Sequence, residues 1–525
     1  MAVLQGDTRV RRIVPPCGKD RPHGDAQRRA RLAAIRTQRA RSLDSPGADG
    51  TAPRTPDDLC FTQATTLARL IATRQVSPVV VTEAVLARAA QVEPALNIFA
   101  LPMADSARAD ARAAEAAVVR GDALGPLHGV PITIKDNVPI AGLPLANGSV
   151  AFGDFVPQAD AAVVRRIRAA GAIIIGKTNL PEFAHKVLTD SPVYGVTRNP
   201  WNLAYTPGGS SGGASAALAA GVAPLAVGTD GGGSLRCPAS CTGVVALKAT
   251  LGRVPNERMP DGFANFAFTG PMARTVGDTA LLLSVMAGAA ADDPFSIGAG
   301  SVAMPEARAV ETVARGLRVG WIEQFGRYRT DPVVADLTRA AVMSLAGEGA
   351  VVEPLADPCF DDVFERYVVL ATTAHAARYG HLPAIWGDRM SASIRASIAN
   401  GQRYSAVEWQ RAHDWRTTLF RAVQRLFERY DVIATPTMIA PPKLVDAEGS
   451  IATEAYAEWA APLYPFNLSS HPAMSVPAGM TGDGLPVGLQ LIGPWFGEQR
   501  LLDVAALLER LLGWPARRPD LTRLR

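Results

Sequence analysis

Short apolar runs alternate with alanine-rich, helix-like patterns along most of the chain. Because each run is apolar at consecutive positions, it predicts a strand with both faces buried, in a sheet that helices cover on each side. The predicted strands are residues 131–134, 172–175, 225–228, 244–247, 432–435, 474–476 and 487–492. The pattern over 159–170, with Asp160 near its start and Gly171 after its end, is typical of a covering helix. An α/β fold is therefore predicted.

Two sections of the chain depart from this alternation. Apolar residues at helical spacing fill residues 64–120, before the first predicted strand. Longer amphipathic helical patterns fill about 292–430, where Trp386, Trp409 and Trp415 lie. We expect this second section to pack beside the sheet and to shape a pocket.

The N-terminal segment is set apart by its composition. Residues 1–56 carry twelve basic and five acidic side chains and end in a stretch that contains Pro and Gly. The segment has no apolar region of the secretory type, so an arginine-rich helix or a disordered extension is favoured over a targeting or anion-binding role. We expect the folded domain to span residues 57–525.

Length and charge limit the classes of function. With 525 residues and 48% apolar side chains, the chain can bury a large core. The net charge of +4 is smaller than the surplus of the N-terminal segment, so the rest of the chain carries about −3, and no nucleic-acid groove is expected there. No uninterrupted apolar run approaches the roughly 20 residues of a membrane helix, which predicts a soluble protein without a membrane partner.

The five cysteines form no disulfide-like or zinc-like array; they are Cys17, Cys60, Cys237, Cys241 and Cys359. We expect reduced thiols in a cytoplasmic protein. Cys237 and Cys241 are separated by three residues, but no second pair of ligands lies nearby, so both are interpreted as small packing residues. Neither a metal nor a cofactor is expected.

Residues 171–178, Gly-Ala-Ile-Ile-Ile-Gly-Lys-Thr, match the phosphate-binding pattern G-x-x-x-x-G-K-[ST] at every position. A phosphate-binding loop must wrap around its anion, whereas Ala-Ile-Ile-Ile prefers an extended strand. Pro181 also falls where the phosphate-facing helix should continue. The match is therefore interpreted as a strand and not as a nucleotide site.

Residues 209–213, Gly-Ser-Ser-Gly-Gly, match the nucleophile elbow G-x-S-x-G, with Ser211 as the nucleophile. An elbow follows a strand, but residues 201–207 look like a loop. His471 could serve as the base, yet nothing in the sequence orients it. A hydrolase centred on Ser211 is therefore the weaker interpretation.

Two loops rich in Gly and Ser form a third set together with one lysine. They are residues 208–213, Gly-Gly-Ser-Ser-Gly-Gly, and 228–236, Gly-Thr-Asp-Gly-Gly-Gly-Ser-Leu-Arg, preceded by 129–137, Gly-Val-Pro-Ile-Thr-Ile-Lys-Asp-Asn. This arrangement, including the 24-residue step from Ser210 to Ser234, resembles the amidase signature family. The resemblance extends from about Asp57 to Leu512 and is densest over about 129–290. Residues 484–493, Gly-Leu-Pro-Val-Gly-Leu-Gln-Leu-Ile-Gly, resemble the C-terminal strand of that family.

The resemblance implies a mostly mixed central sheet and an amidase that uses a Ser-Ser-Lys triad. Ser234 would attack the carbonyl, and Ser210, after a cis peptide bond, would relay the proton to Lys135. The implied oxyanion hole consists of the backbone at Gly231, Gly232, Gly233 and Ser234. Hydrogen bonds that fix the two loops are implied for Ser211, Asp230 and Arg236.

The residue types are suited to this chemistry. Glycines before a serine let backbone N–H groups approach a substrate, as an oxyanion hole requires. None of the seven histidines lies in a motif with a partner, so another base is needed, and a lysine can serve only when neutral. The chain has six lysines against 47 arginines, and Lys135, Lys177 and Lys248 lie in apolar strand contexts. Composition does not choose among these three, whereas the resemblance selects Lys135.

The sequence leaves the substrate open. We expect a small-molecule amide, cleaved to a carboxylate and ammonia or an amine, in a pocket lined by residues near 187–205, 375–409 and 464–467. Trp386, Tyr464 and Phe466 point weakly to an apolar or aryl acyl group. Three alternatives stay open: the A-type subunit of a glutamine-dependent amidotransferase, an esterase or carbamate hydrolase of the same family, and a non-catalytic binding protein. A homodimer is an open option.

Overall fold

The computed structural model describes residues 55–300, 310–445 and 458–524. The arginine-rich extension expected over residues 1–56 therefore lies outside the described residues, except for its last two. The first described helix is α2 (Pro56–Phe61), which Thr55 caps in a capping box with Asp58. The domain boundary at residue 57 stays a prediction.

A mixed sheet of eleven strands runs through the domain in the order β1-β3-β2-β6-β8-β7-β12-β13-β11-β9-β10. The strands are β1 (Phe99–Pro102), β2 (Pro131–Lys135), β3 (Ile173–Thr178), β6 (Leu225–Asp230), β7 (Val245–Lys248), β8 (Phe268–Ala273), β9 (Arg318–Trp321), β10 (Val351–Pro354), β11 (Val432–Pro436), β12 (Ala473–Met480) and β13 (Pro486–Ile492). A separate hairpin-like pair consists of β4 (Asp190–Ser191) and β5 (Gly195–Val196).

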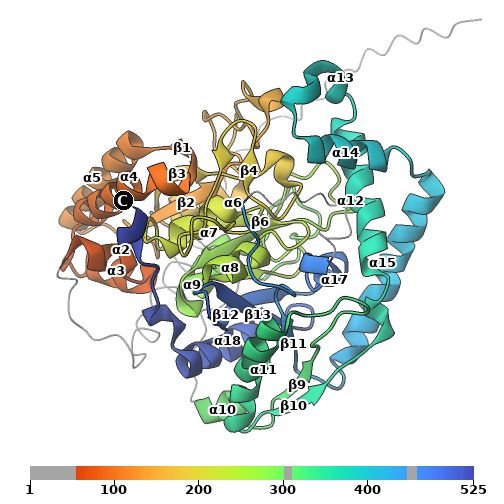
Figure 1. The fold of residues 1–525 in the computed structure, drawn as a ribbon. Coiled ribbons are helices and arrows are strands. Elements are labelled where there is room, and N and C mark those ends of the chain that lie inside the picture. Colours follow the sequence, from red (N-terminus) through yellow and green to blue (C-terminus); the bar gives the residue numbers. More distant parts are fainter. Residues whose placement is uncertain (1–54, 301–309, 446–457, 525) are drawn as a thin grey trace, which may run out of the picture. The chain divides into compact units, whose positions relative to one another are not determined.

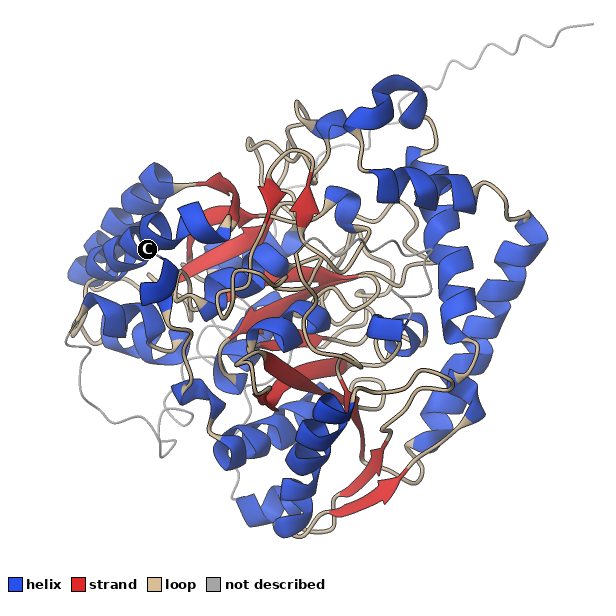
Figure 2. Ribbon diagram, viewed as in Figure 1, coloured by secondary structure: helices blue, strands red, loops and turns tan. Residues whose placement is uncertain are grey.

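Helices lie on both sides of the sheet (Figures 1 and 2). The longer ones are α3 (Ala64–Ala72), α4 (Pro78–Leu96), α5 (Ala104–Arg120), α6 (Ala162–Ala169), α7 (Gly212–Ala219), α9 (Val276–Met286), α11 (Pro332–Gly347), α12 (Val363–Tyr379), α14 (Ala392–Gly401), α15 (Ala406–Leu426) and α18 (Glu498–Leu512). Shorter ones are α8 (Arg236–Thr242), α10 (Val310–Ala314), α13 (Pro383–Trp386) and α17 (Tyr464–Leu468). Single 3₁₀ turns occur at Val150–Phe152, Glu182–Ala184, Pro358–Phe360, Gly387–Arg389, Trp514–Ala516 and Leu521–Leu524.

Alternate residues of the central strands enter different cores. In β6, Leu225 and Val227 belong to the large core that includes α9, α11 and α18, whereas Ala226 packs with Ala214 and Leu218 of α7. The face of β6 that packs against α7 thus carries a small residue, Ala226, which lets this helix approach the sheet closely. A further core joins α12, α15 and α17, and Figure 1 shows α12, α14 and α15 together on one side of the molecule.

The predicted α/β fold with a mixed sheet between helices is confirmed, and each of the seven predicted strands is present. Four strands of the sheet were not predicted: β1, β8, β9 and β10. β1 interrupts the section interpreted as helical over 64–120, and β9 and β10 interrupt the one over 292–430. Both expectations are therefore wrong in part, because β1, β9 and β10 each have an exposed position and do not show the fully buried apolar run by which the other strands were predicted.

Helix α6 begins later than its sequence pattern predicts. It starts at Ala162, and no side chain caps it from its N-cap residue, Ala161. The Ala162 N–H donates instead to Glu257, and Asp160 accepts from the Ala141 N–H at 2.8 Å. A distant carboxylate therefore replaces the local cap that Asp160 was expected to provide.

Candidate active site

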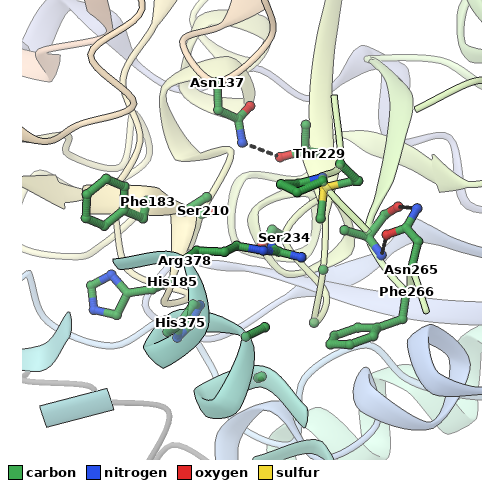
Figure 3. A pocket seen from close by; sticks show the side chains of 18 of the residues that line it. Asn137, Phe183, His185, Ser210, Thr229, Ser234, Asn265, Phe266, His375 and Arg378 are labelled. Atoms are coloured by element: carbon green, nitrogen blue, oxygen red, sulfur yellow. Dashed lines mark hydrogen bonds between the residues drawn. The ribbon is translucent and has the colours of Figure 1, made fainter. Parts of the chain in front are cut away.

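The candidate site lies where the parallel strands β2 and β6 end (Figure 3). Their register pairs Ile134 with Val227, so Lys135 and Thr229 reach the same edge of the sheet. All residues of both strands are buried. A cavity of about 800 Å³ opens at this edge and is lined by Ser210, Thr229 and Ser234, among others.

Lys135 is fully buried and is surrounded by hydroxyl groups. Its Nζ lies 2.7 Å from Ser210 Oγ, 2.9 Å from Ser211 Oγ and 3.0 Å from Thr229 Oγ1. Burial lowers the pKa of Lys135 well below its usual value, and the positive charge of Arg258 lowers it further, while Asp230 acts in the opposite direction. The arrangement favours an uncharged amine at the position where a base would be needed.

The loop with Ser210 and Ser211 is held by close backbone packing. The Gly209–Ser210 peptide bond is cis, as the resemblance implies. A Cβ atom at Gly213 would lie 2.6 Å from the backbone of Asn179 and Ile98, so only glycine fits there. The Ser211 hydroxyl donates to the Thr229 carbonyl at 3.2 Å and accepts from the Thr229 N–H at 3.3 Å. Ser211 therefore joins this loop to the end of β6.

The second loop is held by a buried ion pair. Arg236 Nε and Nη2 each lie 3.0 Å from an oxygen of Asp230, and both side chains are fully buried. Although burial alone would raise the pKa of Asp230, Arg236 and the Asn467 amide hold it well below its usual value. Arg236 also donates to Gln490 Oε1 at 2.6 Å. The pair thus ties the loop to α17 and β13.

Asp230 also occupies one of the backbone donors expected for the oxyanion hole. The Gly233 N–H donates to Asp230 Oδ1 at 2.6 Å. Gly231, Gly232 and Ser234 line the cavity, whereas Gly233 does not. The three lining residues retain backbone N–H groups for which the described residues provide no acceptor.

Ser234 and Ser210 contribute to the same cavity from the two loops (Figure 3). Ser234 is 6% exposed, and its carbonyl accepts from the Ser211 N–H at 3.2 Å. Its hydroxyl makes no hydrogen bond within the described part of the chain, so it faces the space that a substrate would fill.

The other motifs do not contribute to this constellation. Residues 173–178 form β3, which confirms a strand in place of a phosphate loop, and Lys177 lies 2.5 Å from Asp136. Lys248 donates to the His471 carbonyl at 2.5 Å. The nitrogens of His471 contact Ser469 and Gln424, each at 3.0 Å. No described contact links His471 to Ser211, so the elbow interpretation lacks its base.

Cys237 and Cys241 lie in α8, beside the second loop, and both are buried. They pack in the core that contains Tyr464 and Val187, and this confirms their interpretation as packing residues. Within the described ranges, no three His, Cys, Asp or Glu side chains gather as metal ligands.

The cavity walls come from the sections that the sequence indicated, although not from all of the residues it singled out. Val187, His375, Trp409 and Tyr464 line the cavity. Phe466 does not line it, because it packs against Phe325 and Phe360 in the core. Trp386 is also absent from the lining and stacks under the guanidinium of Arg389. These two aromatic residues therefore give no information on the acyl group of the substrate.

Sequence reasoning missed three residues of the cavity that the structure singles out. Thr229 contacts Lys135 and accepts from Asn137 Nδ2 at 3.1 Å. Arg258 and Arg378 bring two positive charges to the cavity. Thr229 stands within the quoted loop motif and could have been selected as a polar residue at a strand end, whereas the two arginines lie among 47 and carry no local signal.

Comparisons with known proteins agree on one family. The model of the Amidase family matches residues 80–502. The chain is 37% identical to the A subunit of the glutamyl-tRNA(Gln) amidotransferase of Roseiflexus sp. (strain RS-1), over 85% of this chain and 96% of that protein. It is 34% identical to an acylamidase of Rhodococcus erythropolis, over 89% of this chain and 98% of that protein.

Solved structures show the same relationship. A 6-aminohexanoate cyclic dimer hydrolase with its substrate superposes with a TM-score of 0.78 and 30% identity, over 88% of this chain and 99% of that chain. A bacterial aryl acylamidase of the amidase signature family superposes with a TM-score of 0.81 and 28% identity, over 87% of this chain and 99% of that chain. The sequence-based prediction of an amidase is confirmed, and the chain belongs to the amidase signature family.

Proposed function

We propose that this protein hydrolyses carboxylic amides of small molecules through an acyl-enzyme intermediate on Ser234. The buried Lys135 amine, bonded to Ser210 at the wall of the cavity that Ser234 lines, carries this proposal. A serine needs a base to become a good nucleophile, and an uncharged amine beside a hydroxyl relay provides one.

The protonation state of Lys135 decides the direction of proton transfer. A neutral amine has two N–H donors and one lone pair, while three hydroxyl oxygens surround this nitrogen. One hydroxyl must then donate to the lone pair. Ser210 and Thr229 both line the cavity, and we assign this role to Ser210 because its oxygen lies closer to the amine, at 2.7 Å against 3.0 Å. Ser210 can therefore pass a proton from Ser234 to Lys135 as the Ser234 oxygen attacks the carbonyl carbon.

The negative charge that develops on the carbonyl oxygen requires donors in place before the reaction. We propose the backbone N–H groups of Gly231, Gly232 and Ser234 for this role. Gly233, expected from the sequence as a further donor, would instead position the loop through Asp230. Removal of one such donor typically costs about 3 kcal/mol of transition-state stabilisation.

The leaving nitrogen must receive a proton before the C–N bond breaks. Lys135 returns the proton through Ser210 to that nitrogen, which leaves as ammonia or an amine and leaves the acyl group on Ser234. A water molecule then loses its proton to the same relay and attacks the acyl carbon. The products are a carboxylate and free Ser234, so the catalytic residues end in their starting state.

A second candidate function follows from relatives that are A subunits of amidotransferases. Such a protein would use glutamine and depend on partner subunits, whereas the acylamidase relative favours a hydrolase of acyl amides. Esters and carbamates undergo the same acyl transfer, so activity on them is included in the proposal. The intact set of Ser234, Ser210 and Lys135 weighs against a non-catalytic binding protein.

We also propose a cytoplasmic protein without a nucleic-acid partner, and a homodimer stays an open option. The cysteines form no disulfide-like array, which supports a cytoplasmic location. The chain has no excess of basic residues after residue 56, which supports the lack of a nucleic-acid partner. No helix of the described segments is long and apolar enough to span a bilayer.

The test uses the purified chain alone with aryl amides, aliphatic amides, carbamates and glutamine. We expect hydrolysis of simple amides that Ser234→Ala reduces by about 10³-fold or more. Ser344→Ala is the matched control, because that hydroxyl lies in α11 and contacts only a carbonyl of its own helix. Turnover of none of these compounds, or a Ser234→Ala variant as active as the parent, would contradict the proposal.

A further inference from the structure

Two guanidinium groups lie in the wall of the active-site cavity without an acidic partner. Arg258 and Arg378 both line the cavity, and Figure 3 shows the Arg378 side chain extending from α12 across it. Neither side chain forms an ion pair or hydrogen bond with another residue in the ranges that the structure describes. The buried Nε of Arg258 in particular has no acceptor there.

The carboxylates near this part of the cavity are engaged elsewhere. Glu257, the neighbour of Arg258, accepts from the first N–H of α6. Asp190 pairs with Lys186 at 2.7 Å. Asp261 lines the cavity, but it accepts from the Ala264 N–H at 3.0 Å. No acid of the described chain therefore forms an ion pair with either arginine, although the charge of Glu257 acts on Arg258 from a distance.

This arrangement is costly for the protein without a ligand. Burial and the repulsion between its charge and that of Arg378 together lower the pKa of Arg258 to about 10, while Tyr379 and Glu257 act in the opposite direction. The positive charge of Arg258 also lowers the pKa of Lys135, so it influences the electrostatics of the proposed catalytic centre. Buried charges in proteins are normally paired, and the described residues provide no ion-pair partner for these two arginines.

We propose that the preferred substrates are amides that also carry a carboxylate, which binds between Arg258 and Arg378. This inference rests on the proposed amidase function and names the substrate class. A guanidinium offers two parallel N–H donors to a carboxylate, and this geometry selects it over a neutral group of the same shape. A carboxylate would supply both the missing acceptor for Arg258 and the missing counter-charge.

The rest of the cavity wall is suited to the uncharged part of such a substrate. Phe152, Phe155, Phe183 and Tyr379 line it, and the rings of Phe183 and Tyr379 stack with centroids 4.0 Å apart. Tyr379 directly follows Arg378 on α12, so apolar and cationic surfaces adjoin. An amide with an apolar chain or ring that ends in a carboxylate would contact both.

The experiment compares substrates that differ only in charge. In one pair, the anilides of adipic acid and of adipamic acid place a carboxylate or a carboxamide at the end of the acyl chain. In the other pair, hexanoyl amides of 4-aminobenzoate and of 4-aminobenzamide place the same groups on the leaving amine. We expect kcat/KM for the carboxylate to exceed that for the carboxamide by about tenfold or more in one pair.

Variants then locate the source of the preference. Arg258→Gln and Arg378→Gln should each reduce the ratio of kcat/KM values toward one, and Arg258→Lys should retain part of it. Arg403→Gln is the control, because Arg403 is exposed and does not line the cavity. Equal kcat/KM values within both pairs for the parent, or a preference that survives both glutamine variants, would overturn the inference.

Failure of the amidase proposal would give a different result. If no amide of either pair is hydrolysed, calorimetric binding of the same compounds to Ser234→Ala decides the question. Binding of the carboxylate at least tenfold tighter than the carboxamide, lost in Ser234→Ala with Arg258→Gln, would uphold the carboxylate site without amidase activity. Equal dissociation constants would overturn it.

Discussion

Lys135 Nζ and Ser210 Oγ are 2.7 Å apart, and both side chains are fully buried. This contact joins the end of a central strand to the loop before α7, 75 residues further along the chain. No carboxylate lies within hydrogen-bonding distance of this nitrogen among the described residues. The lysine therefore sits in conditions that favour its neutral form, and the proposed mechanism depends on that form.

Lys135→Ala should reduce kcat/KM for an anilide by 10² to 10⁴-fold, the usual contribution of general acid and base catalysis. The loss should be smaller for an ester with a phenol leaving group, because a phenolate can leave without a proton whereas an amine cannot. Steady-state kinetics on an amide and ester of the same acid measure both losses. Equal losses for the two would argue against proton return through this residue.

The activity should depend on pH through Lys135. Because only the neutral amine accepts a proton, kcat/KM for an uncharged amide should rise with pH through the lowered pKa of Lys135. Arg258→Gln removes a positive charge that lowers this pKa, so the pKa should rise and the acid limb should move to higher pH. Arg403→Gln should leave the limb in place, and a limb that moves to lower pH in Arg258→Gln would contradict the assignment.

Asp230→Asn should destabilise the fold by about 3–5 kcal/mol, because it leaves the buried Arg236 without its counter-charge. The control is Asp431→Asn, which removes the partner of the exposed Arg318 and should cost no more than about 1 kcal/mol. Urea unfolding of both variants measures the difference. Similar costs for the two would mean that the buried pair does not hold the second loop.

Thr229→Val should lower kcat while the protein stays folded. Valine keeps the shape of threonine but removes the oxygen that contacts Lys135 and Asn137. The loss of one hydrogen bond to a positioned group corresponds to roughly 5- to 30-fold in rate, and Thr229→Ser should restore most of it. If the serine variant were as slow as the valine variant, packing and not the hydroxyl would explain the effect.

The sequence predicted the parts of the fold that depend on local pattern. Strands such as β2 and β6 are buried at successive positions and were found, whereas β9 and β10 have exposed positions and were missed. The proposed catalytic set could be selected because Lys135, Ser210 and Ser234 stand in long motifs in a fixed order. Arg258 and Arg378 come from a loop and a helix with no motif, and only the packing of α12 beside the β7–β8 connection brings them to one cavity.

The same limit explains Gly233 and Phe466. Both stand within segments that the sequence assigned to the site or its walls, but which face each presents is decided by neighbours distant in the chain. The Gly233 N–H donates to Asp230, and the ring of Phe466 packs against Phe325 and Phe360 in the core. Motifs locate a site along the chain, and tertiary contacts decide which of its groups face the substrate.

The central claim is that Ser234, activated through Ser210 and Lys135, is the nucleophile. Intact mass spectrometry after fluorophosphonate treatment, followed by peptide mapping, tests it most directly. We predict one added label, located on Ser234, and a labelling rate that falls steeply in Lys135→Ala. A label on Ser211, or on Ser234 at an unchanged rate in Lys135→Ala, would contradict the account.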